Sequence, residues 1–126
     1  MAVGVVGIWI VTGWSLPHQR GVLEAINLLK GKWTIPLLAA LALGQRQNKD
    51  ILATINETAE SNENGPLSHR VLTDTLQRAT DDGLIERRAE SGNFAAVWYR
   101  LTPKGRSLLH AAMPLAEWAQ QYYQPN

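Results

Sequence analysis

The side chains best suited to chemistry lie in residues 68–77, where polar groups recur at the spacing of helical turns. Ser68 is a good cap for a helix that begins at the next residue. One face of that helix carries side chains that can donate to and accept from the base edges of DNA, namely His69, Arg70, Thr73, Asp74 and Gln77. An ordinary solvated helix face shows the same pattern, so the neighbouring elements must decide between the two interpretations.

The elements around this helix predict a wing directly behind it. Its opposite face is an apolar stripe at i, i+3, i+4 spacing, made of Val71, Leu72, Thr75, Leu76 and Ala79. Gly83 ends the helix. Two short strands follow, GLIERR and AVWYRL, with the hairpin signal Ser-Gly-Asn between them. Thr102 and Pro103 then start a final helix.

Basic and polar residues on and near this hairpin are candidates for contacts to the DNA backbone. Arg87 and Arg88 lie near its tip, where they can rest on phosphates or enter a minor groove. The other candidates are Ser91, Asn93, Lys104 and Arg46. Residues 67–106 contain seven Arg/Lys and five Asp/Glu, a net charge of +2. Contacts to phosphate must therefore come from individually placed residues and not from a strongly basic surface.

The first half of the chain predicts helices joined by short breaks. Apolar residues at helical spacing fill residues 21–43, and KGKWTIP interrupts them. Gly31 is expected to end the first helix, with Thr34 capping the second and Pro36 in its first turn. Gly44 closes that helix. RQNKDILATI predicts a short third helix, followed by an exposed loop to Pro66.

The last predicted helix spans residues 104–123, and Pro114 is expected to kink or divide it. Its apolar stripe is too long for the core of a small monomer, so a second subunit is its natural cover. The chain has five tryptophans and one phenylalanine. Aromatic residues that could line an apolar ligand cavity or the dimer interface are Trp9, Trp14, Trp33, Trp118 and Tyr122. The alternative is that these aromatics are core and interface residues.

Composition limits the classes of function. The chain has 126 residues, 45% of them hydrophobic, and a net charge of +1. We expect an apolar arm at residues 1–17 and one domain at residues 18–126. The arm holds three glycines and lacks the features of a membrane span or an export signal, so we expect a cytoplasmic protein without a membrane partner. Cysteine is absent and the three histidines are far apart, so neither a metal site nor a cofactor is expected.

Three segments resemble the HxlR-type family of bacterial winged helix-turn-helix transcription regulators, which are MarR-like. They are LLKGKW, RVLTDTLQRATDDGLIERR and YRLTPKGRSLL, followed by a late tryptophan. The resemblance extends over residues 21–118. It implies a mainly α, α+β fold: a winged helix-turn-helix domain with a two-stranded β-wing and N- and C-terminal dimerisation helices. It also implies a recognition helix at residues 69–78, a wing at residues 87–94 and a homodimer.

The sequence departs from the family pattern at three places. A cysteine sensor often found in the family would lie near Arg20, and this chain has none. In RQNKD, Gln47 replaces an aromatic residue and Asp50 replaces a leucine, so the third helix should pack differently. The loop at residues 57–66 is longer than usual.

The leading hypothesis is a dimeric, sequence-specific transcriptional regulator that binds double-stranded DNA at a roughly palindromic operator. Its control would come from a small apolar or aromatic effector and not from cysteine oxidation. The alternative is a winged-helix module for protein–protein contacts that does not bind DNA. No nucleophile motif, phosphate loop or paired His/carboxylate arrangement is present, so an enzyme is not expected.

Overall fold

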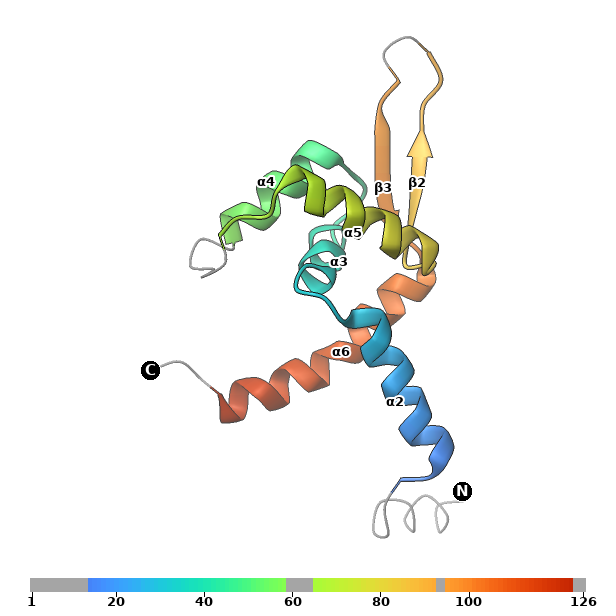
Figure 1. Ribbon diagram of the computed structural model, residues 1–126, viewed down its shortest axis with the longest axis vertical. Coiled ribbons are helices and arrows are strands. Elements are labelled where there is room, and N and C mark those ends of the chain that lie inside the picture. Colours follow the sequence, from blue (N-terminus) through green and yellow to red (C-terminus); the bar gives the residue numbers. More distant parts are fainter. Residues whose placement is uncertain (1–13, 59–64, 93–94, 124–126) are drawn as a thin grey trace. The chain divides into compact units, whose positions relative to one another are not determined.

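The computed structural model describes residues 14–58, 65–92 and 95–123 (Figure 1). Two compact units, Met1–Lys30 and Gly31–Asn126, are each described by themselves. The first contains α2 (Leu16–Leu29), and the second contains α3 (Thr34–Ala40), β1 (Arg46–Gln47), α4 (Asn48–Thr58), α5 (His69–Asp81), β2 (Ile85–Ala89), β3 (Val97–Leu101) and α6 (Pro103–Tyr122). Trp9, Asn93 and most of the 57–66 loop lie outside the described residues. The division into an arm and a domain at residue 17 stays a prediction.

Helix α2 begins before the apolar periodicity that predicts it. The hydroxyl of Ser15 accepts a hydrogen bond from the backbone N–H of His18 at 3.3 Å, and Pro17 stands in the first turn. These two start signals precede Gly21, the residue where the sequence places the helix. No residue of α2 is buried. Its exposed large apolar residues are Leu16, Val22, Leu23 and Ile26.

The start of α3 differs from the sequence prediction. The N-cap is Trp33, and Thr34 is the first helical residue, so the prediction that Thr34 is the cap was wrong. The reason is a long-range contact: the buried Thr34 hydroxyl accepts a hydrogen bond from Nη2 of Arg78 in α5 at 2.8 Å. Gly31 has φ +105°, and a Cβ on it would lie 2.6 Å from the same nitrogen. Gly31, two residues before Trp33, thus leaves room for the guanidinium that ties α5 to α3.

The core of the second unit lies between α3, α4 and α5 and the base of the sheet. Helix α3 is central, because it packs against α4, α5 and α6. Leu37 and Leu38 of this helix are fully buried, and so is Leu41, its C-cap. The other large apolar residues of the core are Ile51, Ile55, Leu67, Leu72, Leu76, Leu84, Ile85 and Leu101. This arrangement fixes α5 firmly along one side.

The sheet has three antiparallel strands in the order β1-β3-β2. The two strands of the predicted hairpin are confirmed as β2 and β3, which extend away from the helices (Figure 1). Strand β1 was not predicted, because two residues carry no alternating pattern. It pairs Arg46 with Tyr99 and Gln47 with Trp98. The start of α4 is therefore held beside the wing.

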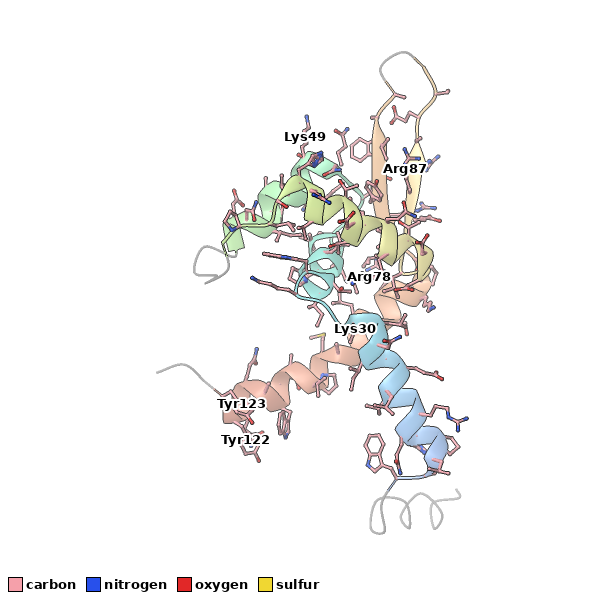
Figure 2. All side chains as sticks on the ribbon, in the orientation of Figure 1. Lys30, Lys49, Arg78, Arg87, Tyr122 and Tyr123 are labelled. Carbon is pink, nitrogen blue, oxygen red and sulfur yellow. The ribbon has the colours of Figure 1, made fainter. Side chains whose placement is uncertain are left out.

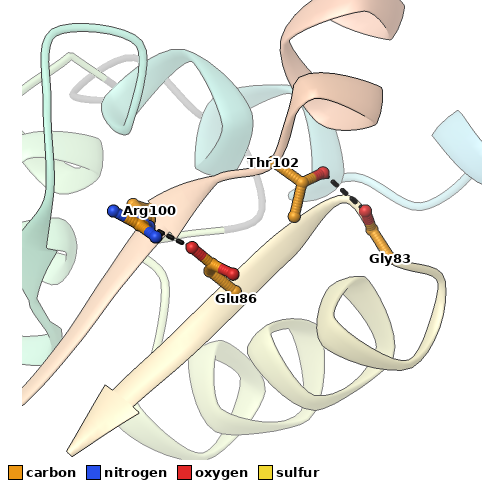
Figure 3. Close-up of polar contacts among 4 residues, drawn as sticks. All are labelled: Gly83, Glu86, Arg100 and Thr102. Carbon is orange, nitrogen blue, oxygen red and sulfur yellow. Dashed lines mark hydrogen bonds and ion pairs between the residues drawn. The ribbon is translucent and has the colours of Figure 1, made fainter.

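The joint between α5, β2 and α6 is built around Thr102. This residue caps α6 as predicted, since its Oγ1 accepts from the backbone N–H of Gly105 at 3.0 Å. The same hydroxyl donates to the backbone oxygen of Gly83 at 2.5 Å (Figure 3). The backbone N–H of Thr102 donates to the oxygen of Leu84 at 3.0 Å. The Thr-Pro-Lys-Gly segment thus fixes the base of the wing against the end of α5.

Helix α6 continues through Pro114, so the proline does not divide it. Its last three turns carry exposed apolar side chains, namely Met113, Leu115, Trp118 and Tyr122. Among the described helices, none combines the length and the apolar character needed to cross a membrane.

Candidate nucleic-acid interface

Helix α5 presents a polar face from a firmly packed base. Ser68 caps it, accepting a hydrogen bond from the backbone N–H of Val71 at 3.2 Å. The buried side of the helix is Leu72, Thr75, Leu76 and Ala79. Val71, predicted to belong to this stripe, is 39% exposed and lies at its edge. The polar residues expected on the opposite face are all exposed: His69, Arg70, Thr73, Asp74 and Gln77.

We call the side of α5 that carries these five polar residues its reading face. The five side chains differ in whether they make hydrogen bonds within the protein. The Thr73 hydroxyl donates to the backbone oxygen of His69 at 3.0 Å, and Gln77 donates to a carboxylate oxygen of Asp81 at 2.9 Å. The side chain of Arg70 makes no hydrogen bond or ion pair with any residue that the structure describes. Its five N–H donors are therefore available to a partner outside the chain.

Asn56 holds the segment that leads into α5 and was not singled out in the sequence. Its Nδ2 donates to the backbone oxygen of Leu67 at 3.1 Å, and its Oδ1 accepts from the N–H of the same residue at 2.8 Å. This pair of bonds ties the residue before the Ser68 cap to α4. A lone asparagine before a loop gives no signal of such a role, because its partner lies eleven residues further on.

Arg87 and Arg88 are both exposed, but successive strand residues point to opposite faces of the wing. Arg87 lies opposite Tyr99 and Arg88 lies opposite Trp98. The Arg88 face also carries the exposed ion pair between Glu86 and Arg100 (Figure 3). The two arginines therefore lie on different faces of the wing. Ser91, further along the hairpin, is exposed.

Two other predicted backbone contacts already have partners within the protein. Nε of Arg46 donates to the backbone oxygen of Ala40, the last residue of α3, at 2.9 Å. Nζ of Lys104 donates to the backbone oxygen of Asp82, at the end of α5, at 2.9 Å. Each cation thus stabilises the carboxyl end of a helix, where the helix dipole favours positive charge. Their contacts with DNA stay predictions.

Four of the five predicted aromatic residues lie in the described part of the chain, namely Trp14, Trp33, Trp118 and Tyr122, and none of these four is buried. Trp14 precedes α2 in the first unit and is 61% exposed. In the second unit Trp33 is half-buried, with Nζ of Lys32 5.0 Å from its ring centre. Trp118 is 52% exposed and its ring centre lies 5.4 Å from that of Tyr122. The exposure of these rings favours a role at an interface over a role in the protomer core.

Comparisons with known proteins point to one class. A family model described as HxlR-like helix-turn-helix matches residues 28–126. An uncharacterised HTH-type transcriptional regulator from Methanothermobacter thermautotrophicus is 31% identical over 98 residues, which cover 78% of this chain and 68% of that protein. The HTH-type transcriptional regulator YodB from Bacillus subtilis is 25% identical over 82% of this chain and 84% of its own length.

Solved structures show the same similarity. A protein described as a transcriptional regulator of the MarR family from Enterococcus faecalis superposes with a TM-score of 0.71 at 28% identity, covering 84% of this chain and 88% of that one. The reduced form of YodB superposes with a TM-score of 0.65 at 25% identity, covering 82% and 92%. The mainly helical winged-helix fold expected from the sequence is confirmed.

Proposed function

The chain belongs to the HxlR-like helix-turn-helix family of transcriptional regulators, and from this premise we propose that it acts as a dimer that binds a specific DNA site through α5. The observation that carries the proposal is the reading face of α5, exposed along its length and supported by a buried apolar side. In a dimer, two such helices would enter successive major grooves about 34 Å apart, at a roughly palindromic operator.

Arg70 is the side chain we assign to direct base recognition. A guanidinium can donate two parallel hydrogen bonds to O6 and N7 of guanine, and Arg70 spends none of its donors on the described residues. His69 lies beside it in the first turn of α5 and is the second candidate. Thr73 and Gln77 already make local hydrogen bonds and are assigned secondary roles. The wing arginines contribute affinity without sequence preference.

Replacing Arg70 and Arg88 separately should distinguish base recognition from backbone contact. Arg70→Ala is expected to weaken operator binding by about 1–3 kcal/mol and to relax specificity at one base pair, while Arg88→Ala weakens all sequences alike. Fluorescence anisotropy on the upstream intergenic duplex and on a scrambled duplex, over a series of salt concentrations, measures both effects. Full operator affinity in both variants would contradict this assignment.

The same titration tests the alternative, a winged-helix module for protein contacts. Its support is the net charge of only +1, low for a protein that relies on phosphate contacts. If the wild-type chain, shown to be a folded dimer, binds neither duplex at low salt, the DNA-binding proposal fails in its ligand-free form. Binding that prefers the native duplex and falls steeply with salt would contradict the alternative.

A small apolar or aromatic effector is the control we propose, since the chain has no cysteine to oxidise. Its support is the pair of Trp118 and Tyr122 on α6, whose rings would line an apolar cavity between the dimerising helices. Titration of planar aromatic metabolites is expected to change tryptophan fluorescence saturably and to shift operator affinity. The fluorescence change should be lost in Trp118→Leu. A panel that changes neither fluorescence nor operator affinity would contradict effector control.

A further inference from the structure

A groove of about 420 Å³ lies between the start of α4 and the wing. Its polar lining residues are Gln47, Asn48, Lys49, Arg87 and Tyr99, and the rest is small or apolar. Pairing of β1 with β3 creates the groove, because it places Gln47 beside Trp98 and so holds the first turn of α4 against the wing. Residues far apart in the sequence thus share one surface within the second unit. Figure 2 labels Lys49 on α4 and Arg87 on the wing.

The charged side chains that line this groove are all positive. Lys49 and Arg87 both line it and both are exposed, and none of its lining residues in the described part of the chain is an aspartate or a glutamate. Neither cation makes a hydrogen bond or ion pair with a residue in the described ranges. The other face of the wing differs, because Arg100 is paired there with Glu86. Two cations without an anionic partner indicate a site for an anion.

Strand alternation selects Arg87 as the wing cation of this groove. Arg87 shares its face with Tyr99, which also lines the groove, whereas Arg88 lies opposite Trp98 on the other face. Ala95, Ala96 and Val97 form the adjoining wall and are small enough to leave it open. The groove therefore combines an ammonium from α4 with a guanidinium from β2, two donors that bind phosphate oxygens well.

We propose that this groove holds one phosphate of the DNA backbone between Lys49 and Arg87. The inference rests on the proposed function. In helix-turn-helix proteins the first helix crosses the backbone while the second lies in the major groove, and here α4 precedes α5 in these positions. One phosphate held from both α4 and β2 fixes the depth and tilt of α5 in the major groove. Lys49 thus joins the DNA-binding residues, and Arg87 acts in a different place from Arg88.

Substitution of Lys49 tests the site directly. Lys49→Gln and Arg87→Gln are each expected to lower affinity about tenfold for operator and scrambled DNA alike. Each should also reduce the slope of log affinity against log salt by about 1. Lys32→Gln is the matched control: it removes the same charge from an exposed lysine of the same unit that does not line the groove, and it should change neither quantity. Unchanged affinity and slope in Lys49→Gln would overturn the proposal.

Neutralising single phosphates shows whether the two cations hold the same one. In a set of duplexes with one methylphosphonate each, one position should weaken wild-type binding by more than tenfold, and the loss at that position should be clearly smaller both in Lys49→Gln and in Arg87→Gln. Arg88→Gln, from the other face, should still lose affinity at that position. If Lys49 and Arg87 respond to different phosphates, the shared site is wrong while DNA binding stands. If the wild-type protein binds no duplex, the proposed function itself fails.

Discussion

Gly105→Ala is expected to destabilise the winged-helix unit by about 4 kcal/mol or more, a large fraction of the stability of a domain of this size. Gly105 is buried in the first turn of α6. A Cβ built on it overlaps the backbone oxygen and carbon of Leu84, at the base of the wing. A flexible side chain could move aside, but here the obstacle is backbone. That backbone is fixed because the Leu84 oxygen accepts a hydrogen bond from the N–H of Thr102.

Thermal unfolding followed by circular dichroism measures this effect, and Gly21→Ala is the matched control. Gly21 lies within α2, and a Cβ there would meet nothing within 4 Å. Alanine is a better helix former than glycine, so this control should keep or raise the melting temperature, by an effect of up to about 1 kcal/mol. A Gly105→Ala variant as stable as the wild type would show that α6 can move away from β2 at little cost.

A general rule based on the sequence alone would give the opposite sign from the one that we expect for Gly105→Ala. A glycine just inside a helix normally weakens it, so the general rule favours alanine. Sequence signals for helix ends that depend only on neighbouring residues were nevertheless reliable around α5 and α6. Ser68 and Thr102 were both identified as caps, and Gly83, with φ +75°, ends α5 as expected. Each of these depends on backbone groups close by in the chain.

Features that depend on distant partners could not be predicted from the sequence. Thr34 has the residue type of a cap, but its hydroxyl is used by Arg78, 44 residues away. Strand β1 exists because β3 offers it a free edge. The same pairing brings Lys49 to the wing, so the groove has no signature in the sequence around either cation. The exposure of the polar residues on the reading face of α5 could be predicted, because they lie on a single helix whose period is known in advance.

The second large effect is expected on α6, whose exposed apolar face we assign to a second copy of the chain. Leu115, Trp118 and Tyr122 follow one another at helical spacing and are 61%, 52% and 63% exposed. Residues three, four and seven apart share one side of a helix, so these three form a single surface. Apolar surface of this kind on a small protein usually indicates an interface. A second α6 related by a two-fold axis would cover it with the same residues.

Leu115→Glu should therefore convert the dimer to a monomer and weaken operator binding about a hundredfold or more, because each half-site is then bound without the help of the other. Gln120→Glu adds the same charge to the opposite side of α6 and should leave both properties unchanged. Light scattering after size-exclusion chromatography measures the mass, and anisotropy measures binding to the full site and to one half-site. The monomer should bind the half-site as tightly as a wild-type protomer does, since Leu115 is exposed and belongs neither to α5 nor to the wing. A dimer that persists in Leu115→Glu would assign the apolar face of α6 to another partner.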